Sequence, residues 1–326
     1  MAVRKAGPRH AVIATCTLSI RDAGDADALL ASGLELIDQM AREAERQGWS
    51  PDIMALPEHF ALPPGSKPHE TAEDLDGRTV AAVAERARAH GSYVVVPMYV
   101  RDGDAVHNSA VLLDRTGDPV GVYHKVFPVV LEDDTVEGGQ TPGREFPVFE
   151  ADFGRVGIQI CWDVVFADGW EAYAAQEAEL VIFPSAAPSI SLVISHAYRY
   201  QYYVASSVMR PPSVIVDPLG LVLSQSSENR EVAVARVDLD YRVVPSRYLW
   251  ERAGKVKEKY GDTIDWNWHS AESACLMTSS DPAMPIGRFL EVEHMMTLKE
   301  WVAYNRRRIA EERGGPPVML AATPGS

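Results

Sequence analysis

Short apolar runs alternate with longer amphipathic stretches along the first third of the chain. The apolar runs have the length and residue types of strands, and they occupy residues 10–20, 51–58 and 92–100. The stretches near Ala28 to Gln47 and near Glu73 to His90 carry apolar residues at helical spacing. This alternation predicts an α/β domain in which helices pack against the faces of a sheet.

The middle of the chain repeats this order after two hairpin-like segments. Residues 108–125 and 146–161 each place a Gly-containing turn between two strand-like runs. Helical patterns near Gly169 to Glu177 and near Val193 to Tyr203 then alternate with strand-like runs at residues 179–186, 212–226 and 231–240. Two similar α/β halves in one chain predict two sheets packed together, with helices on the outside.

The alternation of strand-like and helical segments ends after Leu239, where the chain becomes polar with scattered aromatic residues. A helix is expected near Leu298 to Glu312. We therefore expect residues 1–245 to form one domain and residues 246–326 to form an extension that packs on this domain or across a subunit interface. The segment looks too irregular for a core of its own, and it carries Trp250, Trp266, Trp268 and Trp301, which suits a contact between subunits in a homodimer or larger homo-oligomer.

Composition narrows the possible partners. With 46% hydrophobic residues the chain can bury a large core, and its net charge of -15 disfavours a nucleic-acid or anionic membrane surface. Basic residues precede the first apolar run as in a secretory signal, but the run is short and is interpreted as a strand. No run approaches the roughly 20 apolar residues of a membrane-spanning helix.

The cysteine and histidine content indicates neither a disulfide framework nor a metal site. The three cysteines have no CxxC spacing, and the nine histidines form no HxH or HExxH pattern. We therefore expect no metal, no cofactor and a location in the reducing cytoplasm. The negative net charge favours a small uncharged or cationic molecule as the partner.

Three reactive side chains stand where a predicted strand ends, which is the edge at which open α/β sheets bind ligands. Glu58 ends the run at 51–58, Lys125 ends the first hairpin, and Cys161 follows the apolar residues 156–160. Taken singly, such a Glu or Lys is usually a solvated residue, and a free Cys is usually a small buried hydrophobe. Cys161, however, lies at a turn towards a helix, where free N–H groups are expected to lower the thiol pKa and create a nucleophile.

Taken together, these segments resemble the nitrilase superfamily of carbon–nitrogen hydrolases over roughly residues 10 to 240. The similarity rests on five segments in the family's order, namely Leu56-Pro57-Glu58, Tyr123-His124-Lys125, Gly157-Ile158-Gln159-Ile160-Cys161-Trp162-Asp163, Phe183-Pro184-Ser185-Ala186 and Asp217-Pro218-Leu219-Gly220. The resemblance implies a four-layer α-β-β-α sandwich that commonly pairs into dimers.

The resemblance also implies a role for each residue. Cys161 would attack a carbonyl carbon, Glu58 would take the thiol proton and pass it to the leaving amine, and Lys125 would stabilise the oxyanion. The backbone N–H of Trp162 would be the second oxyanion donor. Family members often have a second pocket Glu, for which the candidates are Glu132 and, preferred by its distance from Thr141-Pro142-Gly143, Glu137. Two carboxylates beside Lys125 would keep the amine protonated and raise the pKa of one acid.

The sequence also departs from the family, which weakens any inference about the substrate. His124 replaces the usual Arg before the Lys, Phe166-Ala167-Asp168 replaces Phe-Pro-Glu, and the loop after Tyr203 looks shortened. Cys161-Trp162-Asp163 is more typical of the amidase and N-carbamoyl branches than of nitrilases, so an amide or N-carbamoyl substrate is favoured over a nitrile. Residues expected to line the pocket are Trp162, Phe166, Ser185, Ala186 and Tyr198.

Two other readings remain open. A Cys–His hydrolase would use His59, His124 or His196 as its base, although nothing local favours this arrangement. A binding protein that keeps the fold without turnover would form no covalent adduct at Cys161.

Overall fold

The computed structural model describes residues 8–18, 25–269 and 273–316, and the chain divides into two compact units. The first unit comprises Arg9–Leu239, and the second begins at Asp240. Residues 317–326 of the predicted C-terminal extension lie outside the described residues.

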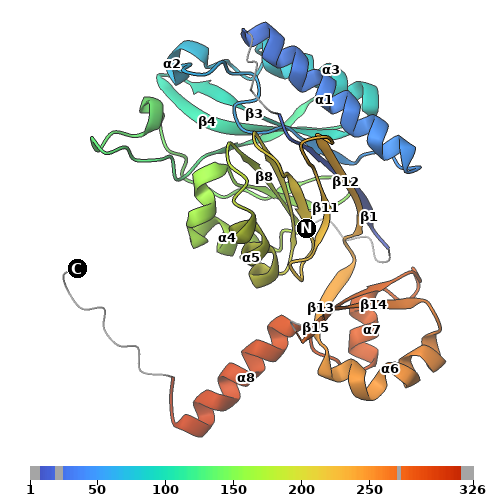
Figure 1. The fold of residues 1–326 in the computed structure, drawn as a ribbon. Helices are drawn as coiled ribbons and strands as arrows, with labels where there is room; N and C mark the ends of the chain where they lie inside the picture. Colours follow the sequence, from blue (N-terminus) through green and yellow to red (C-terminus); the bar gives the residue numbers. More distant parts are fainter. Residues whose placement is uncertain (1–7, 19–24, 270–272, 317–326) are drawn as a thin grey trace. The chain divides into compact units, whose positions relative to one another are not determined.

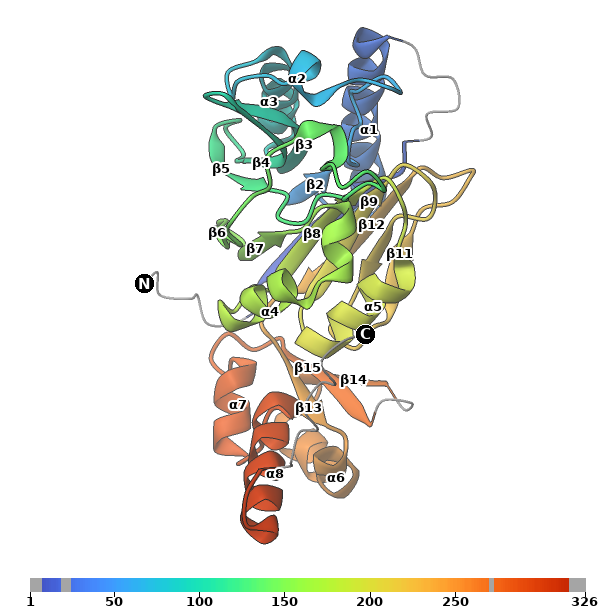
Figure 2. The same ribbon diagram turned by 90° about the vertical axis from the view of Figure 1, so that its left-hand side faces the viewer.

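The first unit contains two sheets of six strands each (Figures 1 and 2). The first sheet has the order β12 (Val232–Asp238), β1 (His10–Cys16), β2 (Ile53–Ala55), β3 (Tyr93–Asp102), β4 (Ala105–Leu113) and β5 (Pro119–His124). The second has the order β11 (Val222–Gln225), β10 (Val214–Val216), β9 (Tyr203–Val208), β8 (Leu180–Ser185), β7 (Arg155–Ile158) and β6 (Phe149–Glu150). In each sheet three parallel strands, β1-β2-β3 and β7-β8-β9, are flanked by antiparallel ones. The two predicted hairpins are β4–β5 and β6–β7.

Helices cover the outer face of each sheet. Helices α1 (Ala26–Arg46) and α3 (Arg78–His90) pack on the first sheet, and α4 (Ala167–Ala175) and α5 (Ile190–Tyr200) pack on the second (Figure 1). Consecutive residues of β1, such as Val12 and Ile13, are both buried, because each sheet is covered on both faces. The predicted four-layer α-β-β-α sandwich is confirmed. A short helix α2 (Pro68–Thr71) and two 3-10 turns, η1 (Glu137–Gly139) and η2 (Cys161–Val165), lie between these elements.

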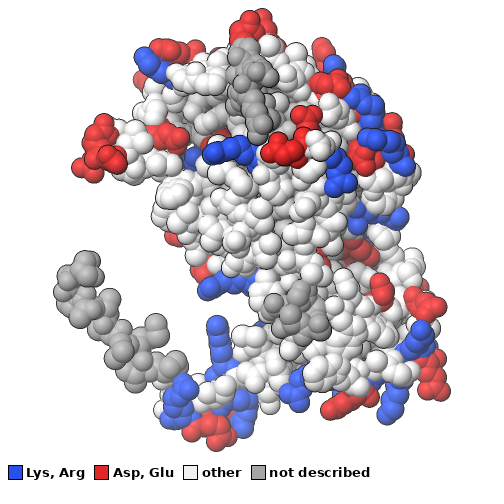
Figure 3. All heavy atoms as spheres, in the orientation of Figure 1, with Lys and Arg blue, Asp and Glu red and all other residues white. Residues whose placement is uncertain are grey.

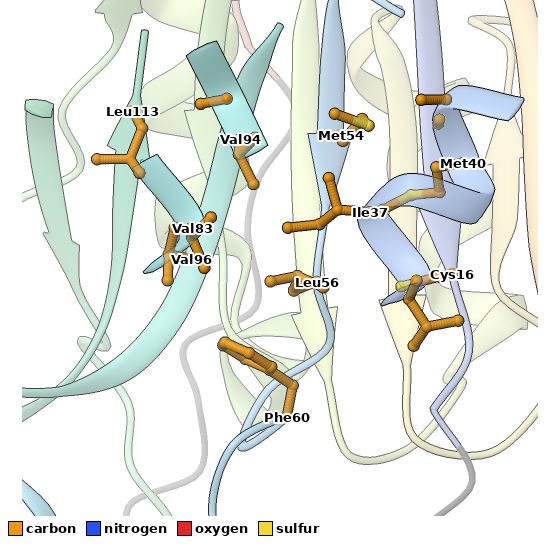
Figure 4. Close-up of a cluster of buried hydrophobic side chains, with 14 of the residues drawn as sticks. Cys16, Ile37, Met40, Met54, Leu56, Phe60, Val83, Val94, Val96 and Leu113 are labelled. Carbon is orange, nitrogen blue, oxygen red and sulfur yellow. The ribbon is translucent and has the colours of Figure 1, made fainter. Parts of the chain in front are cut away.

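The apolar core between the first sheet and its covering helices fixes the segment that follows β2. Apolar residues of α1, including Ile37 and Met40, meet Met54 and Leu56 in one cluster (Figure 4). Phe60 completes this cluster, and its ring packs so closely on α1 that a Cβ at Gly33 would lie 2.4 Å from it. The chain just after β2 is therefore clamped against α1 by Leu56 and Phe60, which stand on either side of Glu58.

Buried hydroxyl groups join the two sheets at the ends of β1 and β9. The Ser207 hydroxyl lies 2.7 Å from the Cys16 carbonyl and 2.8 Å from that of Ala55, and the Ser213 hydroxyl donates to the Cys16 carbonyl over 2.7 Å. Because these side chains are buried and bonded, they fix the sheets relative to each other without leaving unpaired polar groups.

The second unit has a core, which corrects the expectation that this segment is too irregular to form one. Its antiparallel sheet has the order β13 (Tyr241–Pro245), β15 (Ala274–Ser279) and β14 (Ile264–His269), and its helices are α6 (Arg247–Tyr260), α7 (Ile286–Val292) and α8 (Leu298–Arg313). Val244, Leu249, Met277 and Phe289 belong to one buried cluster. The sequence pattern missed it because its apolar residues are divided among short elements. Trp250 is 73% exposed, as expected, and stacks on Trp268.

Candidate active site

Glu58 is held at the C-terminal end of β2 by its buried neighbours Leu56 and Phe60. Its side chain is almost inaccessible to solvent, and both carboxylate oxygens accept hydrogen bonds. Oε1 accepts from Asn108 Nδ2 over 2.8 Å, and Oε2 accepts from the backbone N–H of Ala186 over 3.0 Å. The carboxylate is thus fixed between the ends of β2 and β8 and a side chain within β4.

Lys125 follows β5 and is equally buried. Its backbone N–H donates to the Asn108 carbonyl over 2.8 Å, and its own carbonyl accepts from Gly143 over 2.8 Å, so the main chain is bonded on both sides. The ammonium nitrogen lies 3.2 Å from Glu58 Oε1 and 3.7 Å from Glu137 Oε2. Two carboxylates therefore flank this amine.

Cys161 stands on a sharp turn directly after β7. Its φ of 47° is in the left-handed region, which is uncommon for a residue with a side chain. The Asp163 carboxylate braces this turn, because it accepts from Ile160 N–H over 2.9 Å, from Phe127 N–H over 2.8 Å and from the Tyr123 hydroxyl over 2.7 Å. Asp163 thus ties the cysteine turn to the segment that carries Lys125.

The thiol of Cys161 faces the other two groups. It makes a side-chain interaction with Glu58, and it also meets the Ser185 hydroxyl and the Ala186 backbone amide. The three strand-end residues predicted from the sequence are therefore brought together in one cluster, in which Glu58 and Lys125 are buried and Cys161 is partly buried.

The pKa shifts in this cluster agree only in part with those predicted from the sequence. Burial disfavours the Lys125 ammonium, but Glu58, Cys161 and Glu137 outweigh it and raise the pKa, so the amine stays protonated as predicted. Burial alone would raise the pKa of Glu58, yet Lys125, then His59 and Asn108, lower it to about 2. The expectation of a raised acid pKa is wrong for Glu58, because the cation and the amide donors all face the same carboxylate.

The expected low thiol pKa is also wrong. Burial and the negative charge of Glu58 raise the pKa of Cys161 to about 11, and Lys125 and Ser185 offset this only in part. In the resting protein Cys161 is therefore a neutral thiol beside an ionised Glu58.

The two candidate second carboxylates have different surroundings. Glu137, in the η1 turn, reaches Lys125, as described above. Glu132 is exposed in the acidic loop of residues 132–134, which lies at the left of the face seen in Figure 3. The geometry favours Glu137 over Glu132.

The five predicted pocket residues are not all at one place. Ser185 and Ala186 end β8 beside the thiol. Trp162 is 44% exposed next to Cys161, and the Phe166 ring stacks on Phe127 with centroids 4.0 Å apart. Tyr198 lies on α5, where its Cβ would be 3.6 Å from a Cβ placed on Gly220.

A cavity of about 840 Å³ opens next to this cluster. Its lining includes Ala186 and Glu137, which touch the catalytic candidates, together with His59 and Tyr99. Much of the remaining wall is apolar, formed by Leu62, Pro63, Pro64, Pro68, Met209 and Pro211, and Arg210 and Glu228 add charged groups. Of the five predicted pocket residues, Ala186 belongs to this lining, and Trp162, Phe166, Ser185 and Tyr198 do not.

The alternative histidine bases have other partners. His124 Nδ1 lies 2.7 Å from the Ser109 hydroxyl, and its ring packs on His107. His196 Nε2 lies 2.8 Å from the Val164 carbonyl, and its ring stacks on Trp170. Only His59 approaches the cluster, with Nε2 3.8 Å from Glu58 Oε1.

Asn108 is a further candidate functional residue, which no motif of the sequence had indicated. It bonds Glu58 through its side chain and Lys125 through its carbonyl. A polar residue followed by the apolar run Ala110 to Leu113 of a buried strand is the signal that could have revealed it.

The described residues contain neither a cluster of metal ligands nor a membrane-spanning helix. Within residues 8–18, 25–269 and 273–316, no three His, Cys, Asp or Glu side chains are grouped as metal ligands. In the same residues, no helix combines the length and apolarity needed to cross a bilayer.

Comparison with known proteins assigns the family. The family model for carbon-nitrogen hydrolases matches residues 12–243, and the chain belongs to that family. The chain is similar to omega-amidase NIT2 of Xenopus tropicalis, with 27% identity over 62% of this chain and 82% of that protein. It is also similar to a nitrilase of Pyrococcus abyssi, with 28% identity over 62% of this chain and 82% of that protein.

A solved structure agrees with this assignment. Nit3 of Saccharomyces cerevisiae, a member of branch 10 of the nitrilase superfamily, superposes with a TM-score of 0.61 at 20% identity, over 81% of this chain and 98% of Nit3. At this identity the likeness concerns the fold, which is the nitrilase-superfamily sandwich.

Proposed function

We propose that this protein hydrolyses the carbon–nitrogen bond of a small amide or N-carbamoyl compound through a thioester on Cys161. The observation that carries the proposal is the buried cluster in which Lys125 Nζ lies 3.2 Å from Glu58 Oε1 while the Cys161 thiol faces the same carboxylate. A buried Lys–Glu pair beside a thiol supplies a base, a nucleophile and a cation for a developing oxyanion.

The first half of the reaction acylates the enzyme. Because the Cys161 thiol is neutral at rest, it must lose its proton to become a nucleophile. This proton moves to Glu58 while Cys161 Sγ attacks the carbonyl carbon. The oxyanion is stabilised by the Lys125 ammonium and the backbone N–H of Trp162, which is among the first N–H groups of η2 and has no acceptor within that turn. Glu58 then protonates the nitrogen, the C–N bond breaks, and ammonia or an amine leaves.

The second half restores the thiol. Water loses a proton to Glu58 and attacks the thioester carbon, and the oxyanion meets the same donors. The C–S bond breaks, the sulfur recovers a proton from Glu58, and the acid leaves. Glu137 keeps the Lys125 amine charged throughout, since its Oε2 lies 3.7 Å from Nζ.

The cavity supports a substrate larger than a simple amide. Arg210 lines it, and among the described residues no hydrogen bond or ion pair holds its guanidinium. The Xenopus tropicalis relative is named an omega-amidase. We therefore propose a terminal amide whose far end carries an anionic group that pairs with Arg210, although the overall charge suggested an uncharged or cationic partner. Trp162, Ser185 and Ala186 would lie around the reacting group, whereas Phe166 and Tyr198 remain predictions outside this cavity.

Substrate panels test the reaction class. Ammonia release is measured with simple amides, N-carbamoyl compounds and nitriles, for the wild type and for C161A. The proposal expects ammonia from amides or N-carbamoyl compounds, and none from C161A. Ammonia from nitriles alone would instead favour a nitrilase, which is the name of the Pyrococcus abyssi relative.

Two rival readings give different results in the same experiment. A silent binding protein yields no ammonia from any compound and no covalent adduct. A Cys–His hydrolase keeps its activity in K125A and loses it when His59 is replaced, whereas the proposed mechanism requires the Lys125 cation.

We further propose that the protein is a cytoplasmic homodimer or larger homo-oligomer. The described cysteines, Cys16, Cys161 and Cys275, are all unpaired, which suits a reducing compartment. Trp250 and Trp268 form an exposed aromatic pair of the kind enriched at protein interfaces. A monomeric mass in light scattering at micromolar concentration would contradict the assembly.

A further inference from the structure

The cavity beside the catalytic candidates has an apolar wall that the proposed mechanism does not use. Its residues come from two segments far apart in the sequence, the loop after β2 and the turn after β9. The loop contributes Leu62, Pro63 and Pro64, and the turn contributes Met209 and Pro211. Ligand sites are typically built in this way, from apolar walls with a few charged or polar groups that fix orientation.

The turn after β9 is bonded to the strand end at the reacting centre. The backbone N–H of Met209 donates to the Ser185 carbonyl over 3.2 Å, and Ser185 meets the Cys161 thiol. The Met209 side chain is buried, so its position beside the end of β8 is fixed. Arg210, the next residue of the chain, also lines the cavity. The apolar wall therefore begins close to the thiol and is continuous in sequence with the cation.

The loop after β2 offers few hydrogen-bond donors to a ligand. Pro63 and Pro64 have no backbone N–H. The Leu62 N–H donates to the His59 carbonyl over 2.9 Å. The N–H and the hydroxyl of Ser66 donate to the Pro63 carbonyl over 3.1 and 2.7 Å. Because these groups bond within the loop, a polar chain placed against it would lose water without gaining partners, and a hydrocarbon chain is favoured.

Both ends of this loop are held in place. At its start, Phe60 packs under α1, as described above. Beyond its end, a Cβ at Gly138 would lie only 2.6 Å from Pro68 Cγ, so the buried Pro68 ring packs directly on the η1 turn that carries Glu137. A wall that is already formed before binding loses little entropy when a ligand settles on it.

We propose that this wall binds a hydrocarbon segment of the substrate, which is a terminal amide joined to its anionic end by an apolar body of several carbon atoms. The inference rests on the proposed function and deepens it, because it names the part of the substrate between the amide and the group that pairs with Arg210. The cavity of about 840 Å³ has the size of a site for a drug-sized ligand, and a simple amide fills only a small part of it.

A series of substrates tests the apolar body. Ammonia release is measured with ω-carbamoyl carboxylates in which two to eight methylene groups separate the amide from the carboxylate. Full burial of a methylene group is worth about fourfold in affinity, and this wall is only partly enclosed. We therefore expect kcat/KM to rise about two- to fourfold per methylene group up to an optimum length and to fall beyond it.

A second series of equal lengths separates apolarity from length. In these compounds an ether oxygen replaces the central methylene group. Because the wall gives this oxygen few donors, we expect kcat/KM at least about fivefold below that of the hydrocarbon of the same length.

Variants of the wall test its residues. L62A and M209A should each lower the ratio of kcat/KM for the optimal substrate to that for the shortest one by about three- to tenfold, because each removes part of the apolar contact. L192A is the matched control, since Leu192 lies on α5 with 41% of its surface exposed and is not among the lining residues. It should keep the wild-type ratio. Circular dichroism identifies a variant that does not fold, and the other wall variant then carries the comparison.

Binding to C161A measures the wall without turnover. Isothermal titration calorimetry with the same amides should give a Kd that falls about two- to fourfold per methylene group. If no amide releases ammonia from wild type, the proposed function fails, and these values of Kd still decide the role of the wall.

Three outcomes overturn the inference. The first is a kcat/KM and a Kd that do not improve as methylene groups are added. The second is an ether series that matches the hydrocarbon series. The third is a wild-type ratio in both L62A and M209A, which would mean that the substrate does not contact this wall.

Discussion

At the scale of single residues, the site depends on a few buried polar groups that each bond to more than one partner. Asn108 serves both Glu58 and Lys125, and Asp163 joins the Cys161 turn to the Lys125 segment. Such shared partners fix the reacting groups more firmly than isolated pairs would, because moving one group breaks several hydrogen bonds.

Replacing Asp163 with Asn tests this bracing. An amide in its place presents N–H groups to Ile160, Phe127 or Tyr123, so at least one buried donor loses its acceptor. We expect the free energy of unfolding of D163N to be about 2–3 kcal/mol lower than that of wild type. We also expect its kcat to be at least about tenfold lower. Urea unfolding and steady-state kinetics measure the two effects, and D168N, at an exposed position in α4, serves as the control. Wild-type stability in D163N would show that the bracing is unimportant.

The lowered pKa of Glu58 makes stability depend on pH. An acid whose pKa is about 2 when folded and near 4.5 when unfolded contributes stability above pH 4.5, and this stability is lost as the pH falls towards 2. Between pH 5.5 and pH 3 we expect wild type to lose about 2 kcal/mol more unfolding free energy than E58Q. Urea titrations at the two pH values provide the comparison. Equal losses would mean that Glu58 is not held ionised by its neighbours.

Arg210 is the residue on which the substrate proposal depends. Removing its charge in R210M should raise KM for a terminal amide with a carboxylate at its far end by about 10- to 100-fold, the usual range for a charge-assisted hydrogen bond. KM for a neutral amide of the same length should change little, which makes that compound the matched control. If both values of KM rise together, Arg210 shapes the cavity without recognising an anion.

At the scale of elements, the strand ends could be read from the sequence, because each reactive residue follows a distinct apolar run. The predicted helices also correspond to α1, α3, α4, α5 and α8, with shifted ends. The contacts of Glu58 with Asn108 and of His59 with Tyr99 join residues 40 or more positions apart, so local patterns cannot reveal them. The predicted directions of the pKa shifts of Glu58 and Cys161 were wrong for the same reason. These shifts depend on which charges face each other in three dimensions.

The packing of α1 on the chain after β2 leads to a prediction at this scale. A methyl group at Gly33 would overlap the Phe60 ring, which cannot move without displacing the Glu58 segment. We expect G33A to lower the unfolding free energy by about 1–3 kcal/mol, as overpacking of a core commonly does, and to reduce kcat as well. The control is G48A: Gly48 lies just beyond α1 with open space around it, although its positive φ adds backbone strain. A fully active and stable G33A would show that the clamp on Glu58 is loose.

At the scale of the whole molecule, the chain combines a carbon–nitrogen hydrolase unit with a second unit that has its own sheet and core. Central strands of the first unit, such as β1 and β8, were predictable because each is a largely apolar run. Those of the second were missed because the segment is polar as a whole, although Trp266 and Trp268 alternate with Asp265 and Asn267 as in a half-buried strand. All the residues of the proposed mechanism lie within Arg9–Leu239.

The central claim is that Cys161 forms a covalent acyl intermediate during C–N bond hydrolysis. Intact-mass spectrometry of enzyme quenched during turnover of an amide tests it most directly. We predict a transient mass increase equal to the acyl group, mapped to Cys161, accompanied by ammonia and absent from C161A. Ammonia release with no adduct at Cys161, or with C161A still active, would contradict the account.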